Sequence, residues 1–366
     1  MTLRLITQLV LIGLSIGSLP LIYSAIKGNQ KNYQRLVWLV LFCTFDLIIF
    51  GAFTRLTDSG LGCPDWPGCY GHSNPLFAMD KILEAQIQMP TGPVTVSKAW
   101  IEMIHRYFAM GVGFLMIVLT VTAWLKKSSL GKSTAWLSTI LLLLICCQGA
   151  FGAWTVTMKL QPIIVTTHLL LALLLLIGLS ALTEISSSQR STPATSKLGS
   201  YSIVIPLIGM YVLFKQVFLG AWVSTNYAVL ACTDFPLCHG KWIPDMDIHN
   251  GFTWWRELGK TATGDALDIQ ALIAIHWGHR LGALITLTVL TLIYVWVRRS
   301  IANRTDEHAH RIRFWIKALG WIAIAQLITG VSNVVLHWPI IAALAHTAGA
   351  AALLVCMTKL IFLAKK

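Results

Sequence analysis

The sequence predicts an all-α protein that crosses a membrane many times and contains an internal repeat. Its 366 residues are 56% hydrophobic and 12% charged, whereas soluble domains are usually about 25% charged. Apolar runs of about 20 residues, the length that spans a bilayer, recur along the chain. One pattern, Gly-Ala followed by Leu, Cys, Asp, Pro, Cys and Gly at fixed spacing, occurs at 51–71 and again at 220–240. These features predict two pseudo-symmetric four-helix bundles related as a parallel repeat, plus one extra N-terminal transmembrane helix.

Nine apolar runs are long enough to be membrane-spanning helices. They lie near 4–25, 36–56, 98–125, 133–158, 162–183, 201–223, 270–297, 314–336 and 340–363. The first run has no clear cleavage site, and basic residues follow it as in a cytoplasmic loop. We therefore interpret it as an extra helix and not as a signal peptide. The other eight runs form two sets of four, and an even number of helices inserts both sets in the same orientation.

The chain accordingly divides into four segments. Residues 1–35 hold the extra helix and a basic loop, and residues 36–183 are expected to form the first four-helix bundle. Residues 184–200 are rich in Ser and Thr, a composition typical of a flexible linker, which we place in the cytoplasm. Residues 201–366 are expected to form the second four-helix bundle.

The basic residues are concentrated in short loops on one side of the predicted helices. The net charge of +13 does not indicate nucleic-acid binding, because these residues lie between apolar runs. By the positive-inside rule their loops are cytoplasmic, which places the N-terminus outside and the C-terminus in the cytoplasm. These basic residues are Lys27, Lys31, Arg35, Lys126, Lys127, Lys132, Arg190, Lys197, Arg298, Arg299, Arg304, Arg311, Arg313, Lys365 and Lys366.

Two pairs of cysteines lie in the long outer loops, which run from about 57 to 97 and from about 224 to 269. Because the outer compartment is oxidising, we expect one disulfide between Cys63 and Cys69 and another between Cys232 and Cys238. The alternatives are four unpaired thiols, or a zinc site with a nearby histidine whose spacing does not match a zinc finger.

The same loops contain stretches that favour helices at the membrane surface. We expect these interfacial helices at 76–88 and 250–260. Trp254 and Trp255 would then lie at the level of the lipid headgroups, where tryptophan is enriched. Ordinary loop tryptophans are the alternative interpretation.

Histidines inside the predicted spans indicate function, because an ionisable side chain in the membrane is costly. His105 and His168 lie a few residues below the outer ends of their helices, and His279 and His346 do the same in the second half. At about 1.5 Å per residue, all four lie roughly 9–14 Å below those ends. Two opposed imidazoles in a four-helix bundle are what a six-coordinate heme needs. Copper, zinc or histidines that only pack in the core are the alternatives.

Arginines and glycines near these histidines suit a heme. Arg106 and Arg280 directly follow a candidate ligand, and with Arg55 they are candidates to bind heme propionates, because a guanidinium can pair bidentately with a carboxylate. Glycines would let a planar macrocycle approach the backbone, although small residues also serve ordinary helix packing. The nearby glycines are Gly111, Gly113, Gly149, Gly152, Gly278, Gly282, Gly330 and Gly349.

The two halves differ three residues before the first histidine of each pair. The first half has Glu102 there and the second has His276, and this spacing places each on the face of its neighbouring ligand. A carboxylate at a heme edge can accept a proton or stabilise a developing cation, so we predict that Glu102 is catalytic. The alternative is that Glu102 only hydrogen-bonds a loop.

A second difference between the halves lies in the middle of the membrane. Asp46 and Lys215 occupy equivalent positions in the first helix of each half. Each alone would be an unpaired charge in hydrocarbon. We therefore predict that they form an ion pair across the repeat axis.

These residues resemble the heme A synthase family over about residues 36–363. No single motif is specific, but together they are. The motifs are Gly-Ala-Phe-Thr-Arg-Leu-Thr-x-Ser-Gly-Leu at 51–61, Cys-Pro-Asp-Trp-Pro-x-Cys at 63–69, Glu102-x-x-His105-Arg106, Gln-Gly-x-x-Gly at 148–152 ahead of His168, His279-Arg280, and His346.

The resemblance implies an oxidoreductase with a substrate site and a cofactor site. The substrate, heme O, would bind at His105 and His168 beside Glu102, and heme b would be the cofactor on His279 and His346. The implied reaction oxidises the C8 methyl of heme O to a formyl group by successive hydroxylations and loss of water. Because a bis-histidine heme has no open coordination site, either a substrate-side histidine dissociates or electron removal lets water supply the oxygen.

The resemblance also implies a location and partners. The protein would lie in the cytoplasmic (inner) membrane, with a periplasmic N-terminus and a cytoplasmic C-terminus. Heme O, membrane lipid, a heme O synthase and an unidentified electron donor would be its partners, with no nucleic acid. A homo-oligomer is left open. The extra helix at 4–25 departs from the eight-helix family pattern, which leaves its role open.

Two other function classes compete with the enzyme. A diheme b-type electron-transfer cytochrome would also hold two histidine pairs, but such proteins more often place their hemes at opposite membrane depths. A heme transporter or assembly chaperone would bind heme without needing Glu102. The heme content of the purified protein separates these hypotheses.

Overall fold

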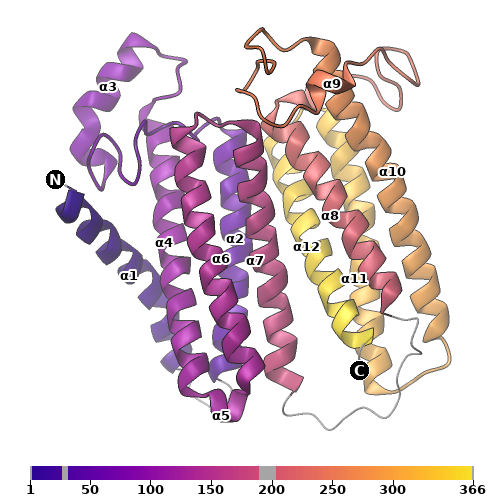
Figure 1. The fold of residues 1–366 in the computed structure, drawn as a ribbon. Helices are drawn as coiled ribbons and strands as arrows, with labels where there is room; N and C mark the ends of the chain where they lie inside the picture. The colour runs from indigo at the N-terminus through magenta and orange to yellow at the C-terminus, as the bar shows by residue number, and fades with distance from the viewer. Residues whose placement is uncertain (1, 27–31, 189–202, 365–366) are drawn as a thin grey trace. The chain divides into compact units, whose positions relative to one another are not determined.

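The computed structural model describes residues 2–26, 32–188 and 203–364, and the regular structure in these ranges is helical (Figure 1). The all-α prediction is therefore confirmed for the described part of the chain, which contains isolated β-bridges but no β-strand. The helices up to residue 188 are α1 (Thr2–Ile26), α2 (Asn32–Leu56), η1 (Pro75–Ala78), α3 (Met79–Gln88), α4 (Val96–Leu125), α5 (Lys127–Leu130), α6 (Lys132–Thr157) and α7 (Pro162–Ser188). The later helices are α8 (Val204–Thr225), η2 (Ala228–Leu230), α9 (Ile248–Gly251), α10 (Ile269–Ser300), α11 (Glu307–Val335) and α12 (Ile340–Ala364).

Within the described residues, eight helices are long and apolar enough to cross a membrane: α2, α4, α6, α7, α8, α10, α11 and α12. They correspond to the eight later apolar runs of the sequence. Their outward surfaces carry large apolar side chains, such as Leu143 (62% exposed), Trp321 (71%) and Ile341 (84%). Extensive exposed apolar surface of this kind marks contact with a membrane.

The ninth predicted span forms helix α1. Its apolar stretch over Arg4–Ser18 is shorter than the eight spans, so a membrane crossing by α1 stays a prediction. This helix packs on α4 at two glycines. A Cβ on Gly13 would collide with Met110, and a Cβ on Gly17 would collide with Phe114, which shows how closely the two helices approach.

The described chain separates into two compact units. One contains α1–α6 and the part of α7 from Thr167, and the other contains Gln161–Thr166 and the chain from α8 onward. The predicted linker at 184–200 begins inside α7, which continues to Ser188, and residues 189–200 lie outside the described residues. The predicted cytoplasmic residues Lys27, Lys31, Arg190, Lys197, Lys365 and Lys366 also lie outside them.

Helix α4 is central to the first unit, because it packs against α1, α2 and α6. Its buried face carries Met103, Leu115, Met116 and Leu119, which are at most 1% exposed. These positions recur at helical spacing, as expected for one buried stripe. Helix α7 packs on α6, where Leu141 lies against the backbone of Gly178.

The helices of the second unit form a closed ring of neighbours. Helix α8 contacts α10 and α12, and both α10 and α12 contact α11. This ring places the outer end of α10 beside the loop that holds η2 and α9. The candidate ligands on α10 and α12 therefore belong to neighbouring walls of the same ring.

One of the two helices predicted in the long loops forms, and its position at the membrane surface stays a prediction. The segment predicted at 76–88 forms η1 and α3, whereas the helix predicted at 250–260 is wrong, because only the short α9 forms there. Helix α9 ends at Gly251 with Phe252 as its C-cap, and an isolated bridge joins Lys260 to Ala266. Trp254 and Trp255 are exposed, and their position at the headgroups stays a prediction.

Candidate functional site

Each unit contains one pair of candidate ligands, and the two histidines of a pair lie on different helices. In the second unit, His279 on α10 and His346 on α12 have ring centroids 6.5 Å apart and ring planes at 80°. Two imidazoles that each bond one metal ion at about 2.0–2.1 Å have centroids about 6–6.5 Å apart. The observed spacing therefore fits one iron between the two rings. In the first unit, His105 on α4 and His168 on α7 are close enough to interact electrostatically.

Each candidate ligand packs its ring against a glycine of a neighbouring helix. A Cβ atom on that glycine would lie 3.0–3.3 Å from the Cε1 atom of the histidine, which is closer than an ordinary contact. The pairs are Gly51 with His105 (3.1 Å), Gly152 with His168 (3.3 Å), Gly220 with His279 (3.0 Å) and Gly330 with His346 (3.2 Å). These four glycines, of which Gly51 and Gly220 belong to the repeated sequence pattern, thus leave room for the imidazole rings.

Glutamines hold the helix backbone at the level of the rings. The Nε2 atom of Gln148 donates to the carbonyl of His168, and that of Gln326 donates to the carbonyl of His346, both at 2.9 Å. Gln216 donates to the carbonyl of His279 at 3.1 Å. These bonds tie the helices of three of the four ligands to a neighbouring helix.

The other glycines near the histidines fall into different classes. A Cβ on Gly113 or Gly149 would meet open space, so both fit the expected approach of a macrocycle. Gly282 instead makes room for the side chain of Gln216, and Gly349 for that of Gln326. The remaining glycine beside α1, Gly111, lies against Ile16, which is ordinary helix packing.

Both predicted disulfides form, Cys63–Cys69 and Cys232–Cys238, each with Cα atoms 4.9 Å apart. The alternative of four unpaired thiols is therefore wrong. Among the described residues, no group of three or more His, Cys, Asp and Glu side chains is arranged to hold a metal ion. The absence of such a group among the described residues also argues against a zinc site in the disulfide loops.

An aspartate organises each disulfide loop from inside. The carboxylate of Asp65 accepts the N–H groups of Tyr70 and Gly71, both at 2.6 Å. In the second loop, Asp234 accepts those of Gly240 (2.9 Å) and His239 (2.8 Å). The bond from Gly240 and the bond from His239 hold the pKa of the Asp234 carboxyl below its usual value.

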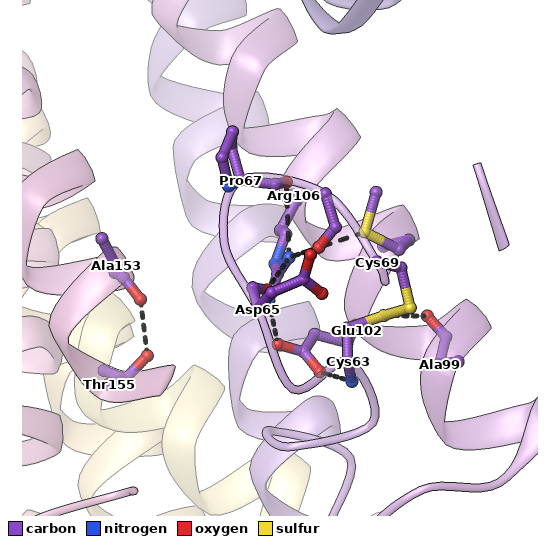
Figure 2. A network of polar contacts seen from close by, with 12 residues as sticks. Cys63, Asp65, Pro67, Cys69, Ala99, Glu102, Arg106, Ala153 and Thr155 are labelled. Atoms are coloured by element: carbon purple, nitrogen blue, oxygen red, sulfur yellow. Dashed lines mark hydrogen bonds and ion pairs between the residues drawn. A yellow bond between two sulfur atoms is a disulfide. The ribbon is translucent and has the colours of Figure 1, made fainter. Parts of the chain in front are cut away.

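The arginine that follows the first histidine of each pair clamps the disulfide loop (Figure 2). Arg106 donates to the carbonyls of Asp65 (3.0 Å), Pro67 (3.3 Å) and Gly68 (2.5 Å). Arg280 donates to the carbonyls of Leu237 (2.7 Å) and Cys232 (3.0 Å). Both guanidinium groups thus bind loop carbonyls, and their binding of propionates stays a prediction.

Arg55, the third propionate candidate, lies in the last turn of α2. Its Nη1 atom lies 3.3 Å from the Asp58 carboxylate. Asp58 is largely exposed, so this ion pair lies at the water-facing end of the helix. The propionate role of Arg55 also stays a prediction.

Glu102, on α4, is buried against the first disulfide loop, with 4% of its surface exposed. Its Oε2 atom accepts the N–H of Cys63 at 2.8 Å, and its Oε1 atom pairs with Arg106 at 2.5 Å (Figure 2). These are the contacts expected from the loop-anchoring interpretation. A catalytic role of Glu102 is compatible with them and stays a prediction.

His276 takes the place of Glu102 in the second unit. Its Nδ1 atom accepts the N–H of Cys232 at 3.2 Å, and Arg280 lies 3.3 Å from its Nε2 atom. The two residues therefore anchor equivalent loop cysteines with different chemistry. One is a carboxylate and the other is an imidazole.

Asp46 and Lys215 belong to different units, so their predicted ion pair stays a prediction. The described contact of Lys215 is within its own helix. Its Nζ atom lies 4.9 Å from the ring centroid of Tyr211. A cation over an aromatic face is stabilised by the quadrupole of the ring.

Comparison with known proteins identifies the family. The family described as cytochrome oxidase assembly protein matches residues 34–358. The chain belongs to this family. A relative from Shewanella oneidensis, named heme A synthase, is 37% identical over 333 residues, which cover 88% of this chain and 95% of the relative.

Other members carry the same name at lower identity. A heme A synthase from Rhizobium etli is 29% identical over 344 residues, 88% of each chain. One from Shouchella clausii is 28% identical over 273 residues, which cover 73% of this chain and 76% of the relative. The match spans both units, so the family assignment applies to both histidine pairs.

The fit of a heme to these residues is clearest in the second unit. The 6.5 Å ring spacing of His279 and His346 suits one iron. The Nδ1 atoms of His105 and His168 are buried and have no hydrogen-bond partner among the described residues. An iron bound at Nε2 would leave these Nδ1 atoms unpartnered, so they give no separate support for a heme in the first unit. The four histidines lie on membrane-length helices, two in each unit, and their pairing around a heme stays a prediction.

Several residues of the site escaped the sequence analysis. Gln216, Gln326 and Thr329 contact candidate ligands, and only the matching spacing of Gln148 and Gln326 from their histidines gave a signal. Arg256 is a buried loop cation with 3% of its surface exposed. It donates to Asn226 at 2.5 Å, and burial lowers its pKa.

Proposed function

We propose that this protein is a heme A synthase, an oxidoreductase that converts the C8 methyl of heme O to a formyl group. The observation that carries the proposal is the pair of histidine sites, one in each unit, in a chain 37% identical to a heme A synthase over 95% of that relative. Successive hydroxylations of the methyl followed by loss of water give the aldehyde. Heme A for terminal oxidases is the product.

The proposed architecture is two pseudo-symmetric four-helix bundles, each of which binds one heme. The first, over 36–183, receives heme O at His105 and His168. The second, over 201–366, holds heme b at His279 and His346. The Gly–imidazole contacts support this arrangement, since they recur at equivalent positions in both units. Heme b, when bound, would supply one-electron redox chemistry.

Glu102 is the proposed proton acceptor of the substrate site. It is one helical turn from His105 on α4, and a carboxylate there can take up protons released as the methyl is oxidised. Arg106 and the N–H of Cys63 hold its two oxygens in place. The disulfide loop and this buried ion pair together shield the outer side of the site from bulk water.

The proposed location is the cytoplasmic (inner) membrane. The disulfides in the outer loops fit an oxidising periplasm, and the basic loops fit the cytoplasmic side. A periplasmic N-terminus and a cytoplasmic C-terminus follow. A heme O synthase, an electron donor and a second copy of the chain are proposed partners.

Heme analysis by mass spectrometry tests the function. Purified wild-type protein should contain heme b together with heme O or heme A. The Glu102→Ala variant should lose heme A while His279 and His346 keep heme b. Heme b alone in both units would instead support a diheme cytochrome, and the absence of a stably bound heme in the second unit would support a transporter. Heme A accumulation in Glu102→Ala would overturn the catalytic assignment.

A further inference from the structure

The two histidine pairs differ in what contacts the Nδ1 atom of each ring. In the second unit, His346 Nδ1 lies 3.0 Å from the hydroxyl of Thr329 and His279 Nδ1 lies 3.0 Å from the amide of Gln216. In the first unit, Nδ1 of both His105 and His168 is buried without a partner among the described residues. The second pair is therefore held by side chains that the first pair lacks.

The sequence accounts for this difference. Thr329 directly precedes the glycine that faces His346, and the residue at the same position of the first half is Phe151. Gln216 lies four residues before the glycine that faces His279, and its counterpart is Leu47. Neither Phe nor Leu has a side-chain hydrogen-bonding group. The asymmetry is thus encoded in the chain.

The contacts of Thr329 determine the protonation of the His346 ring. The threonine hydroxyl donates its single hydrogen to a main-chain carbonyl, that of Ala325 at 2.8 Å. Its oxygen can then only accept from the ring, so the Nδ1 atom of His346 carries a proton. A neutral imidazole protonated at Nδ1 has a free lone pair on Nε2. Thr329 therefore selects the tautomer that can bond iron through Nε2.

Gln216 contacts His279 in a different way. Its amide nitrogen donates to the His279 carbonyl at 3.1 Å and lies 3.0 Å from Nδ1 of the same residue. The amide therefore packs against the Nδ1 edge of the ring and limits its rotation. Gly282 leaves the space that this side chain occupies.

We propose that Thr329 and Gln216 are positioning residues that make the second histidine pair a retained heme site, whereas the first pair, without such partners, binds its heme exchangeably. The inference rests on the proposed function. Hydrogen bonds to the outer nitrogen of a ligating histidine fix the ring and raise its basicity, and their loss typically costs about 10–100-fold in metal affinity. A site that must admit substrate and release product benefits from the weaker hold.

The test measures how fast heme b leaves the purified holoprotein for an excess of apomyoglobin. Thr329→Val keeps the shape of the side chain and removes the hydroxyl, and it should speed release about 10–100-fold. Thr329→Ser should restore slow release, because it keeps the acceptor. Thr347→Val is the matched control, since its hydroxyl bonds the Ala343 carbonyl at 3.2 Å and the residue directly follows His346.

A second readout reports the ligand itself. Loss of the Nδ1–H hydrogen bond makes the imidazole a weaker donor, so the reduction potential of heme b should rise in Thr329→Val and stay at the wild-type value in Thr347→Val. Equal release rates and potentials for wild type and Thr329→Val would overturn the inference. So would equal behaviour of the Val and Ser variants.

Heme content separates failure of the inference from failure of the proposed function. If wild-type protein holds heme b that His346→Ala loses, the second site exists as proposed. Unchanged release from Thr329→Val would then refute only the role of Thr329. If His346→Ala retains all the heme of the wild type, the proposed heme site itself is wrong.

Discussion

The contact between Gly220 and His279 allows the site to be tested with one methyl group. A Cβ on Gly220 would lie 3.0 Å from Cε1 of His279, several tenths of an ångström inside an ordinary contact. Free of heme, the ring can turn away from the new methyl. Bound to iron at Nε2, the ring is fixed, so the strain falls on the heme-bound state.

The size of the effect follows from the cost of overpacking. Inserting a methyl into a well-packed site costs about 1–3 kcal/mol, which corresponds to about a 5- to 150-fold weaker binding of heme b. Alanine also favours a helix over glycine by about 0.8–1.0 kcal/mol. The Gly220→Ala helix should therefore remain folded while heme is lost.

The assay compares heme b content and release in Gly220→Ala and Gly113→Ala. A Cβ on Gly113 would meet no atom within 4 Å, so that variant should retain heme b in the second unit like the wild type. Circular dichroism checks that both variants keep their helices. Equal heme retention by the two variants would refute the proposed fit between glycine and ligand.

Two further predictions concern the loops. Arg106→Leu leaves Glu102 buried without its cation and should lower the free energy of unfolding by about 3–5 kcal/mol. Lys241→Ala removes an exposed pair with Asp245 and should leave the free energy of unfolding nearly unchanged. Chemical denaturation of both variants checks this, and similar losses would contradict it. At the start of α11, the hydrogen bond from Arg304 and the N–H of Ala309 lower the pKa of Asp306 to about 2. The stabilising contribution of Asp306 should be complete above its unfolded pKa of about 3.9 and disappear as pH falls through about 2. Asp306→Asn should therefore flatten the acid limb of a profile of thermal unfolding against pH. An unchanged limb would show that Asp306 contributes nothing.

The sequence predicted the spans well because hydropathy alone determines where a chain can cross lipid. It was less accurate where helices leave the membrane. The run predicted at 314–336 forms a helix from Glu307, because Asp306 caps polar first turns that hydropathy does not detect. The helix predicted at 250–260 failed, because α9 ends at Gly251 with Phe252 as its C-cap.

The sequence predicted the candidate ligands but not the side chains that contact them. A repeat search detects what two halves share, so it found the histidines, the cysteines and the glycines. Thr329 and Gln216 differ from their counterparts Phe151 and Leu47 and were therefore missed. The bond from Cys63 to Glu102 joins residues 39 apart in sequence, and only the folded loop reveals it.

The exchange of Glu102 for His276 has an electrical consequence. Glu102 and Arg106 are oppositely charged and cancel, whereas His276 accepts a hydrogen bond through Nδ1 and is neutral, which leaves the charge of Arg280 unbalanced by this neighbour. In the proposed heme protein, a neutral imidazole in place of the carboxylate would leave more positive charge near the heme of the second unit, which would raise the reduction potential of that heme.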